Sequence, residues 1–196
     1  MNPLTRQLLE RLWEGAPTFK IVESRLTEEC QSMSPAEAAV IGRDLILRRN
    51  ALFTDNFHIA AWLASDGMAG NDGFMDFTDC VALLPDDRYQ AILANPDELI
   101  NDPVSSGFDE LYLVAMVTKV FDRAMLDGDA SGGLLHYLVL GDKTEEHGIS
   151  TQTEEDIKKR LPLLYAKFGH LLRPSQNTCG SSPPDWGTVT LNDFIR

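Results

Sequence analysis

Aspartates gather in the stretch from residue 66 to residue 87, which contains no basic residue. Its members are Asp66, Asp72, Asp76, Asp79, Asp86 and Asp87. On a helix, Asp72, Asp76 and Asp79 would share one face, because residues three and four apart are neighbours there. Such carboxylates can hold a metal ion or act as a general acid and base. They also repel one another, so we expect a positive charge to face them, either within this protein or on a partner.

A second acidic segment, Asp127–Gly132, resembles the first half of a calcium-binding loop, because Asp127, Asp129 and Ser131 occupy its oxygen-bearing positions. The second half differs, since Leu138 stands where the loop needs a bidentate glutamate. We therefore predict a turn in which the aspartate side chains bond their own backbone, and no calcium site. Asp127 and Asp129 remain possible neighbours of the acidic stretch.

The remaining reactive side chains show no spacing typical of catalysis. No histidine lies three or four residues from another histidine or a cysteine, and the three cysteines are far apart: His58, His136, His147, His170, Cys30, Cys80 and Cys179. The sequence also lacks a nucleophile elbow, a P-loop and a dinucleotide-binding glycine pattern. We expect no catalytic residue, no metal, no cofactor and no enzymatic activity. Free thiols in a reducing cytoplasm are the simplest interpretation of the cysteines.

The net charge is −13, from 17 basic and 30 acidic residues, and it is unevenly distributed. Residues 1–60 carry −1, residues 147–196 carry +1, and residues 61–146 carry the whole excess of −13. A chain this acidic is repelled by nucleic acid and by anionic membrane surfaces, which leaves basic proteins as its natural partners. The alternative is that the acidic surface only keeps the protein soluble.

The elements that must position these residues are predicted to be helices. With 196 residues and 43% hydrophobic residues, the chain can form one domain with its own core. Apolar stripes at helical spacing start at Asn2, Phe19, Phe57, Phe74, Pro85 and Phe108. Capping residues at Ser34 and Thr153 predict the starts of two more helices. The second of these is predicted to run through Phe168 and to end at Gly169. The composition of residues 67–73 predicts a loop.

We therefore predict an all-α, single compact domain over residues 1–170, with an irregular tail packed on it over residues 171–196. Residues 134–141 are the one place where a short strand or hairpin competes with a helix. The first 20 residues lack the uninterrupted apolar region of a signal sequence, and no stretch approaches about 18 apolar residues. We expect a cytoplasmic protein that does not enter membranes.

Several motifs, taken in order, resemble the core of a bacterial domain family of unknown function. They are Ala60-Ala61-Trp62, Asn71-Asp72-Gly73-Phe74 with Phe77, Asn95-Pro96-Asp97-Glu98-Leu99, Phe108-Asp109-Glu110, and the run from Arg160 to Gly169. The resemblance spans roughly residues 10–170 and implies a helical fold without an established reaction. Asn71 departs from the family's usual aspartate, and Thr78-Asp79-Cys80 replaces its usual arginine and tryptophan. We interpret Gly73 as a turn residue, and Phe74 and Trp62 as core residues.

These features favour a binding protein, and our leading hypothesis is an immunity protein that inhibits a basic bacterial toxin in a one-to-one complex. A nuclease toxin fits best, because its cleft must be positive to bind phosphate. The residues predicted to bind it are Asp66, Asp72, Asp76, Asp79, Asp86, Asp87, Asp127 and Asp129. Two alternatives remain open: a metal-dependent or hydrolytic enzyme that uses the Asp66–Asp79 carboxylates, and an acidic DNA mimic with several basic partners.

Overall fold

Every regular element in the described part of the protein is a helix, which confirms the all-α prediction. The computed structural model describes residues 1–16, 18–65, 71–101, 116–126 and 153–172. The α-helices are α1 (Pro3–Trp13), α2 (Phe19–Ser32), α3 (Pro35–Ala51), α4 (Asp55–Ala64), α5 (Asn71–Ala82), α6 (Asp86–Ala94), α7 (Met116–Ala124), α9 (Glu154–Arg160) and α10 (Pro162–Phe168). Two 3₁₀ helices, η1 (Pro96–Asn101) and η5 (Gly169–Leu172), complete the described elements. Residues 134–141 lie outside the described residues, as does the predicted 171–196 tail beyond Leu172.

The helix starts follow the predicted capping residues. The Asn2 side chain accepts a hydrogen bond from the Leu4 backbone N–H, with Pro3 in the first helical position. Ser34 and Glu37 exchange both hydrogen bonds of a capping box at the start of α3, as Thr153 and Asp156 do at α9. Each of these hydrogen bonds satisfies a backbone group that a helix end leaves unpaired.

Two predicted boundaries were wrong. The helix α5 starts at Asn71, so Gly73 lies inside a helix and is no turn residue. The predicted single helix from Thr153 to Phe168 is two helices, α9 and α10, which meet at Leu161. The Leu161 backbone is not helical (φ −129°, ψ 59°), because Pro162 disfavours the α-helical conformation in the residue that precedes it.

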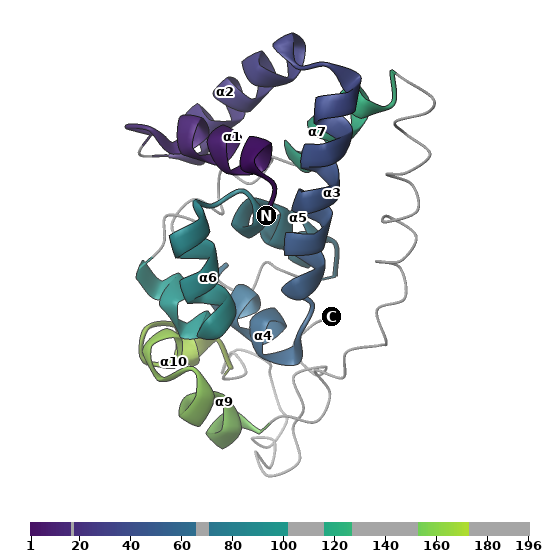
Figure 1. The fold of residues 1–196 in the computed structure, drawn as a ribbon. Helices are drawn as coiled ribbons and strands as arrows, with labels where there is room; N and C mark the ends of the chain where they lie inside the picture. The colour runs from purple at the N-terminus through teal and green to yellow at the C-terminus, as the bar shows by residue number, and fades with distance from the viewer. Residues whose placement is uncertain (17, 66–70, 102–115, 127–152, 173–196) are drawn as a thin grey trace, which may run out of the picture.

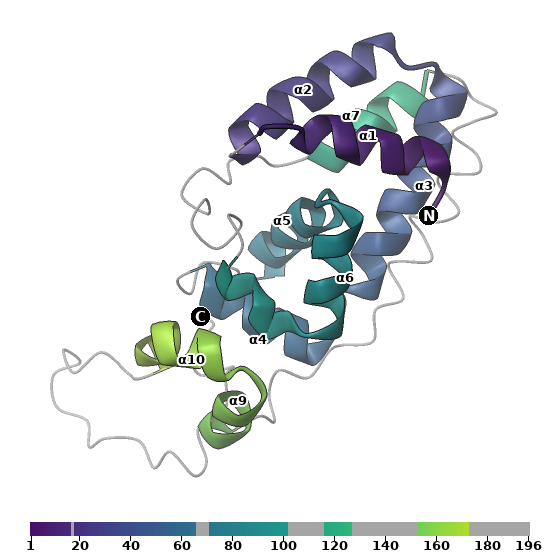
Figure 2. The same ribbon diagram turned by 60° about the vertical axis from the view of Figure 1, so that its left-hand side comes forward.

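The 17-residue helix α3 connects the two ends of the molecule. At one end it packs against α1 and α7, and at the other against α5. Figure 1 shows α1, α2 and α7 around the first half of α3, with α4, α6, α9 and α10 toward the opposite end. Figure 2 shows α1 lying across the α5–α6 side of the molecule. All of these helices contribute to one hydrophobic core, in which Trp62 and Phe74 are buried as predicted.

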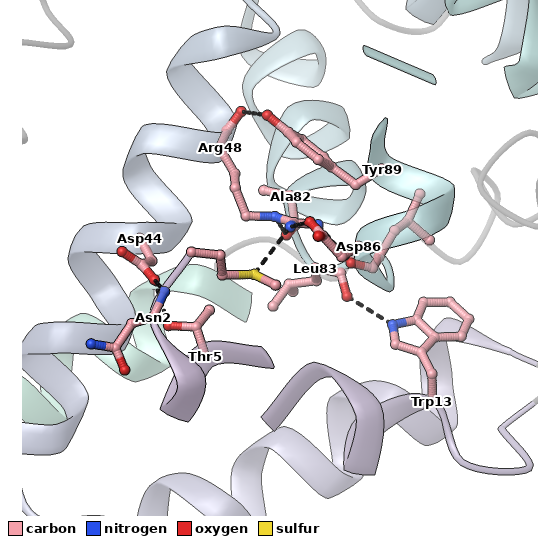
Figure 3. Close-up of polar contacts among 11 residues, drawn as sticks. Asn2, Thr5, Trp13, Asp44, Arg48, Ala82, Leu83, Asp86 and Tyr89 are labelled. Carbon is pink, nitrogen blue, oxygen red and sulfur yellow. Dashed lines mark hydrogen bonds and ion pairs between the residues drawn. The ribbon is translucent and has the colours of Figure 1, made fainter. Parts of the chain in front are cut away.

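Polar contacts hold the start of α1 on α3. The Asp44 carboxylate of α3 accepts hydrogen bonds from the Asn2 backbone N–H and, at 2.9 Å, from the Thr5 hydroxyl (Figure 3). Because Thr5 is fully buried, its hydroxyl requires a partner inside the protein. These hydrogen bonds fix the start of α1 against α3.

Candidate functional site

The structure describes both the backbone and the side chain of four of the eight predicted partner-binding aspartates. Asp76 and Asp79 lie on α5, and Asp86 and Asp87 form the first turn of α6. Asp72 belongs to α5, although the structure does not describe its side chain. The other three fall outside the described residues: Asp66, Asp127 and Asp129. We refer to Asp76, Asp79, Asp86 and Asp87 together as the α5–α6 acidic face.

Asp86 is bound to an internal arginine. Arg48, only 7% exposed, donates from Nη1 to Asp86 Oδ1 at 2.8 Å and from Nε and Nη2 to the carbonyls of Ala82 (2.9 Å) and Leu84 (2.7 Å). The Tyr89 ring lies 3.8 Å from the guanidinium carbon, and its hydroxyl donates to the Arg48 carbonyl at 2.8 Å. Figure 3 shows this network. Burial lowers the pKa of Arg48, and the neighbouring Tyr89 and Asp86 oppose that shift.

Asp79 also meets an internal arginine, but at a longer distance. Its Oδ1 atom lies 3.7 Å from Arg49 Nη1, and the two side chains are 13% and 11% exposed. Neither Asp79 Oδ1 nor Arg49 Nε makes a hydrogen bond in the described structure. Burial raises the pKa of Asp79, Arg49 lowers it and the nearby Asp76 raises it, and together these effects bring it to about 6. Asp79, one of the predicted partner-binding residues, is therefore nearly buried.

The positive charge expected opposite the acidic helix is thus partly internal. Arg49 faces Asp79, and Arg48 binds Asp86, whose side chain keeps 39% exposure. Asp76 is half-buried, and Asp87 is exposed. Of the α5–α6 acidic face, Asp87 and the exposed part of Asp86 are therefore the groups most accessible to a partner.

A groove that the sequence analysis missed adjoins this face. Its volume is about 530 Å³, and it is lined by Gln7, Glu10, Arg11, Trp13, Glu14 and Pro85. Pro85 directly precedes Asp86, so the groove continues the acidic face toward α1. A signal was present, because Trp13 and Glu14 lie three and four residues after Glu10, and both of these spacings place a side chain next to Glu10 on a helix surface. Pro85, in contrast, joins them only through the fold.

The buried histidine and cysteine side chains within the described ranges serve packing, whereas His170 is exposed. His58 is buried and stacks on Phe74, with ring centres 4.1 Å apart. Cys30 and Cys80 are free and buried, and burial raises the pKa of both thiols, which disfavours the reactive thiolate. Among the residues that the structure describes, no three His, Cys, Asp or Glu side chains come together as a metal-binding set.

The motifs behind the family resemblance have structural roles wherever they are described. Phe74 packs edge-on against Phe53, with ring centres 5.3 Å apart. Asp97, 3% exposed, accepts hydrogen bonds from the backbone N–H groups of Leu163 (2.9 Å) and Leu164 (2.8 Å) at the start of α10. Asp97 of the Asn95-Pro96-Asp97 motif therefore caps α10, which begins within the Arg160–Gly169 motif, although more than 60 residues separate Asp97 from α10.

Comparison with known proteins adds no relative to this description. No family model, no curated protein and no solved structure matches the chain. Within the described ranges, no helix combines the length and apolar character that a membrane-spanning segment needs. Any function must therefore be argued from the side chains and charges described above.

Proposed function

We propose that this protein is an immunity protein, which binds a basic bacterial toxin one-to-one in the cytoplasm and blocks it through an acidic surface. The observation that carries the proposal is the distribution of charge, since residues 61–146 hold the entire excess of −13. A nuclease toxin is the most suitable partner, because its phosphate-binding cleft is positive. An acidic helical domain complements such a cleft and accelerates its capture.

The described contacts indicate which part of the acidic surface is available. Arg48 and Arg49 engage Asp86 and Asp79, so those two aspartates contribute less to the outward field than the sequence implies. Asp87 is exposed on the first turn of α6 and is the strongest described candidate for a partner contact. Membership in the bacterial family of unknown function is part of this proposal and rests on the sequence motifs alone.

Genes adjacent to the one for this chain supply the test, because toxin and immunity proteins must be inherited together. Each neighbouring product is expressed alone and together with this protein, and growth and complex formation are measured. We expect one neighbour to be basic and toxic alone, and to form a one-to-one complex in which its toxicity is lost. The proposal fails if no neighbouring product binds this protein or is neutralised by it.

A second function, a carboxylate-dependent enzyme, is favoured by one observation. Burial raises the pKa of Asp79 to about 6, and a carboxyl group that titrates near neutral pH is typical of a general acid or base. If Asp79 and Asp76 bind a divalent cation, magnesium or manganese should raise the thermal midpoint of the wild type and leave Asp79→Asn unchanged. An immunity protein should show no such cation-dependent shift.

A further inference from the structure

The groove beside the α5–α6 acidic face has a fixed aromatic wall. The Trp13 indole Nε1 donates a hydrogen bond of 2.8 Å to the Leu83 carbonyl, in the turn between α5 and α6 (Figure 3). The Trp13 ring also meets the Phe19 ring edge-on, with centres 5.0 Å apart and planes at 88°. These two contacts hold the half-buried indole in place while it lines the groove. The groove wall is therefore formed before any partner arrives, which lowers the entropy lost on binding.

Two arginines, Arg11 on the groove wall and Arg25 beside Glu14, form internal hydrogen bonds. Arg11 forms two hydrogen bonds to the Glu29 carboxylate, at 2.8 and 2.7 Å. Arg25 donates to the carbonyls of Leu12 (3.0 Å) and Glu14 (2.6 Å), where it satisfies the last carbonyls of α1. The charge of Arg11 is therefore balanced by Glu29, whereas Arg25 is bonded to uncharged carbonyls and keeps its positive charge near Glu14, at one end of the groove.

Glu10 and Glu14 supply the negative charge of the groove. Both side chains are exposed and line the groove, and neither carboxylate makes a hydrogen bond or an ion pair with any described residue. They lie one helical turn apart on either side of Trp13 in the sequence. An aromatic ring flanked by two carboxylates suits a cationic side chain, because the ring face attracts a cation and the carboxylates pair with it. The aliphatic part of lysine or arginine can lie along Trp13 and Pro85.

We propose that the groove lined by Glu10, Trp13, Glu14 and Pro85 is a subsite for a lysine or arginine side chain of the protein partner. It extends the α5–α6 acidic face, since Pro85 is shared between the groove and the start of α6. The inference deepens the proposed function and rests on it for the existence of a basic partner. No role for this surface was predicted from the sequence, whereas the fold joins it to Asp86 and Asp87.

A hexa-arginine peptide at low salt is the probe for this subsite. Binding is measured by calorimetry, and the indole N–H resonance of Trp13, assigned with a Trp13→Phe variant, reports occupancy of the groove. The groove variant is Glu10→Gln with Glu14→Gln. The matched control is Asp122→Asn with Glu155→Gln, because both of these side chains are exposed and the change in net charge is the same. A third variant, Asp76→Asn with Asp87→Asn, tests the α5–α6 acidic face.

We expect the groove variant to weaken peptide binding about tenfold or more and to abolish the Trp13 shift, and the control to weaken it less than about threefold. Equal losses in groove and control variants would show an effect of net charge alone and overturn the subsite. A loss confined to the Asp76 and Asp87 variant would overturn the subsite while leaving the proposed function standing. If the peptide does not bind the wild type, the result counts against both the subsite and the proposed function.

Discussion

Asp79 on α5 faces Arg49 on α3 across 3.7 Å, with both side chains nearly buried and without a hydrogen bond between Asp79 Oδ1 and any described group. The attraction of Arg49 is weaker than the cost of removing the Asp79 carboxylate from water, so the pKa of Asp79 rises to about 6. This relationship makes α5 sensitive to pH and removes Asp79 from the surface that a partner can reach.

The first prediction concerns the pH dependence of stability. Between about pH 4 and about pH 6 the folded protein keeps a proton on Asp79 that the unfolded chain has released. Because the folded state binds more protons, the contribution of Asp79 to the free energy of unfolding falls as pH rises through this window. Asp79→Asn should remove this slope. At about pH 7 its free energy of unfolding should equal that of the wild type or exceed it by up to ~3 kcal/mol.

Urea unfolding of wild type and Asp79→Asn across this pH range checks the prediction, because groups common to both proteins cancel in the difference. Asp87→Asn is the matched control, since Asp87 is exposed on α6 and its loss should leave the slope unchanged. A wild type that gains stability relative to Asp79→Asn as pH rises would mean that Arg49 dominates, contrary to our account.

A second prediction follows from the long-range cap at α10. Asp97→Ala removes the acceptor of two backbone hydrogen bonds and leaves the buried Leu164 N–H unpaired. We expect a loss of about 2–4 kcal/mol in the free energy of unfolding. Glu98→Ala, at the neighbouring half-buried position, should change stability by less than about 1 kcal/mol. Similar losses for both variants would argue against a specific role for Asp97.

Arg48 gives a third prediction, because its planar guanidinium serves Asp86 and two carbonyls at once. Lysine preserves the charge but cannot reproduce this geometry, so Arg48→Lys should lower the free energy of unfolding by about 2 kcal/mol or more. Arg6→Lys on the exposed side of α1 provides the control and should be neutral within about 0.5 kcal/mol. Chemical denaturation monitored by circular dichroism compares them, and an Arg48→Lys protein of wild-type stability would show that charge alone suffices.

Local signals predicted most of the fold. Proline in the first helical turn and side chains that cap the helix at Asn2, Ser34 and Thr153 marked helix starts correctly, because these effects act within a few residues. The start of α5 was misplaced because Asn71 and Gly73 are common in turns, and packing of Phe74 on Phe57 and His58 of α4 overrides that preference. The break at Leu161 was readable from Pro162 and was missed in favour of the longer stripe.

The candidate site was less predictable, because it depends on contacts between distant residues. The sequence showed that aspartates gather between residues 66 and 87, but not that Arg48 and Arg49 of α3 would bind two of them. Nor could it bring Trp13 to Leu83, a contact across 70 residues that creates the groove wall. Charge patterns therefore located the acidic region, and only the fold distinguished its internal members from its exposed ones.

The claim at the centre of this account is that the acidic surface captures a basic protein partner. Its most direct test is the association rate with a toxin encoded by a neighbouring gene, at about 50 and about 250 mM salt. Asp87→Lys is compared with Glu155→Lys, because both residues are exposed in the first turn of a helix. We predict a rate that falls about tenfold or more with salt, and that Asp87→Lys slows association further than Glu155→Lys does. A rate that is independent of salt, or equal slowing by both variants, would contradict the account.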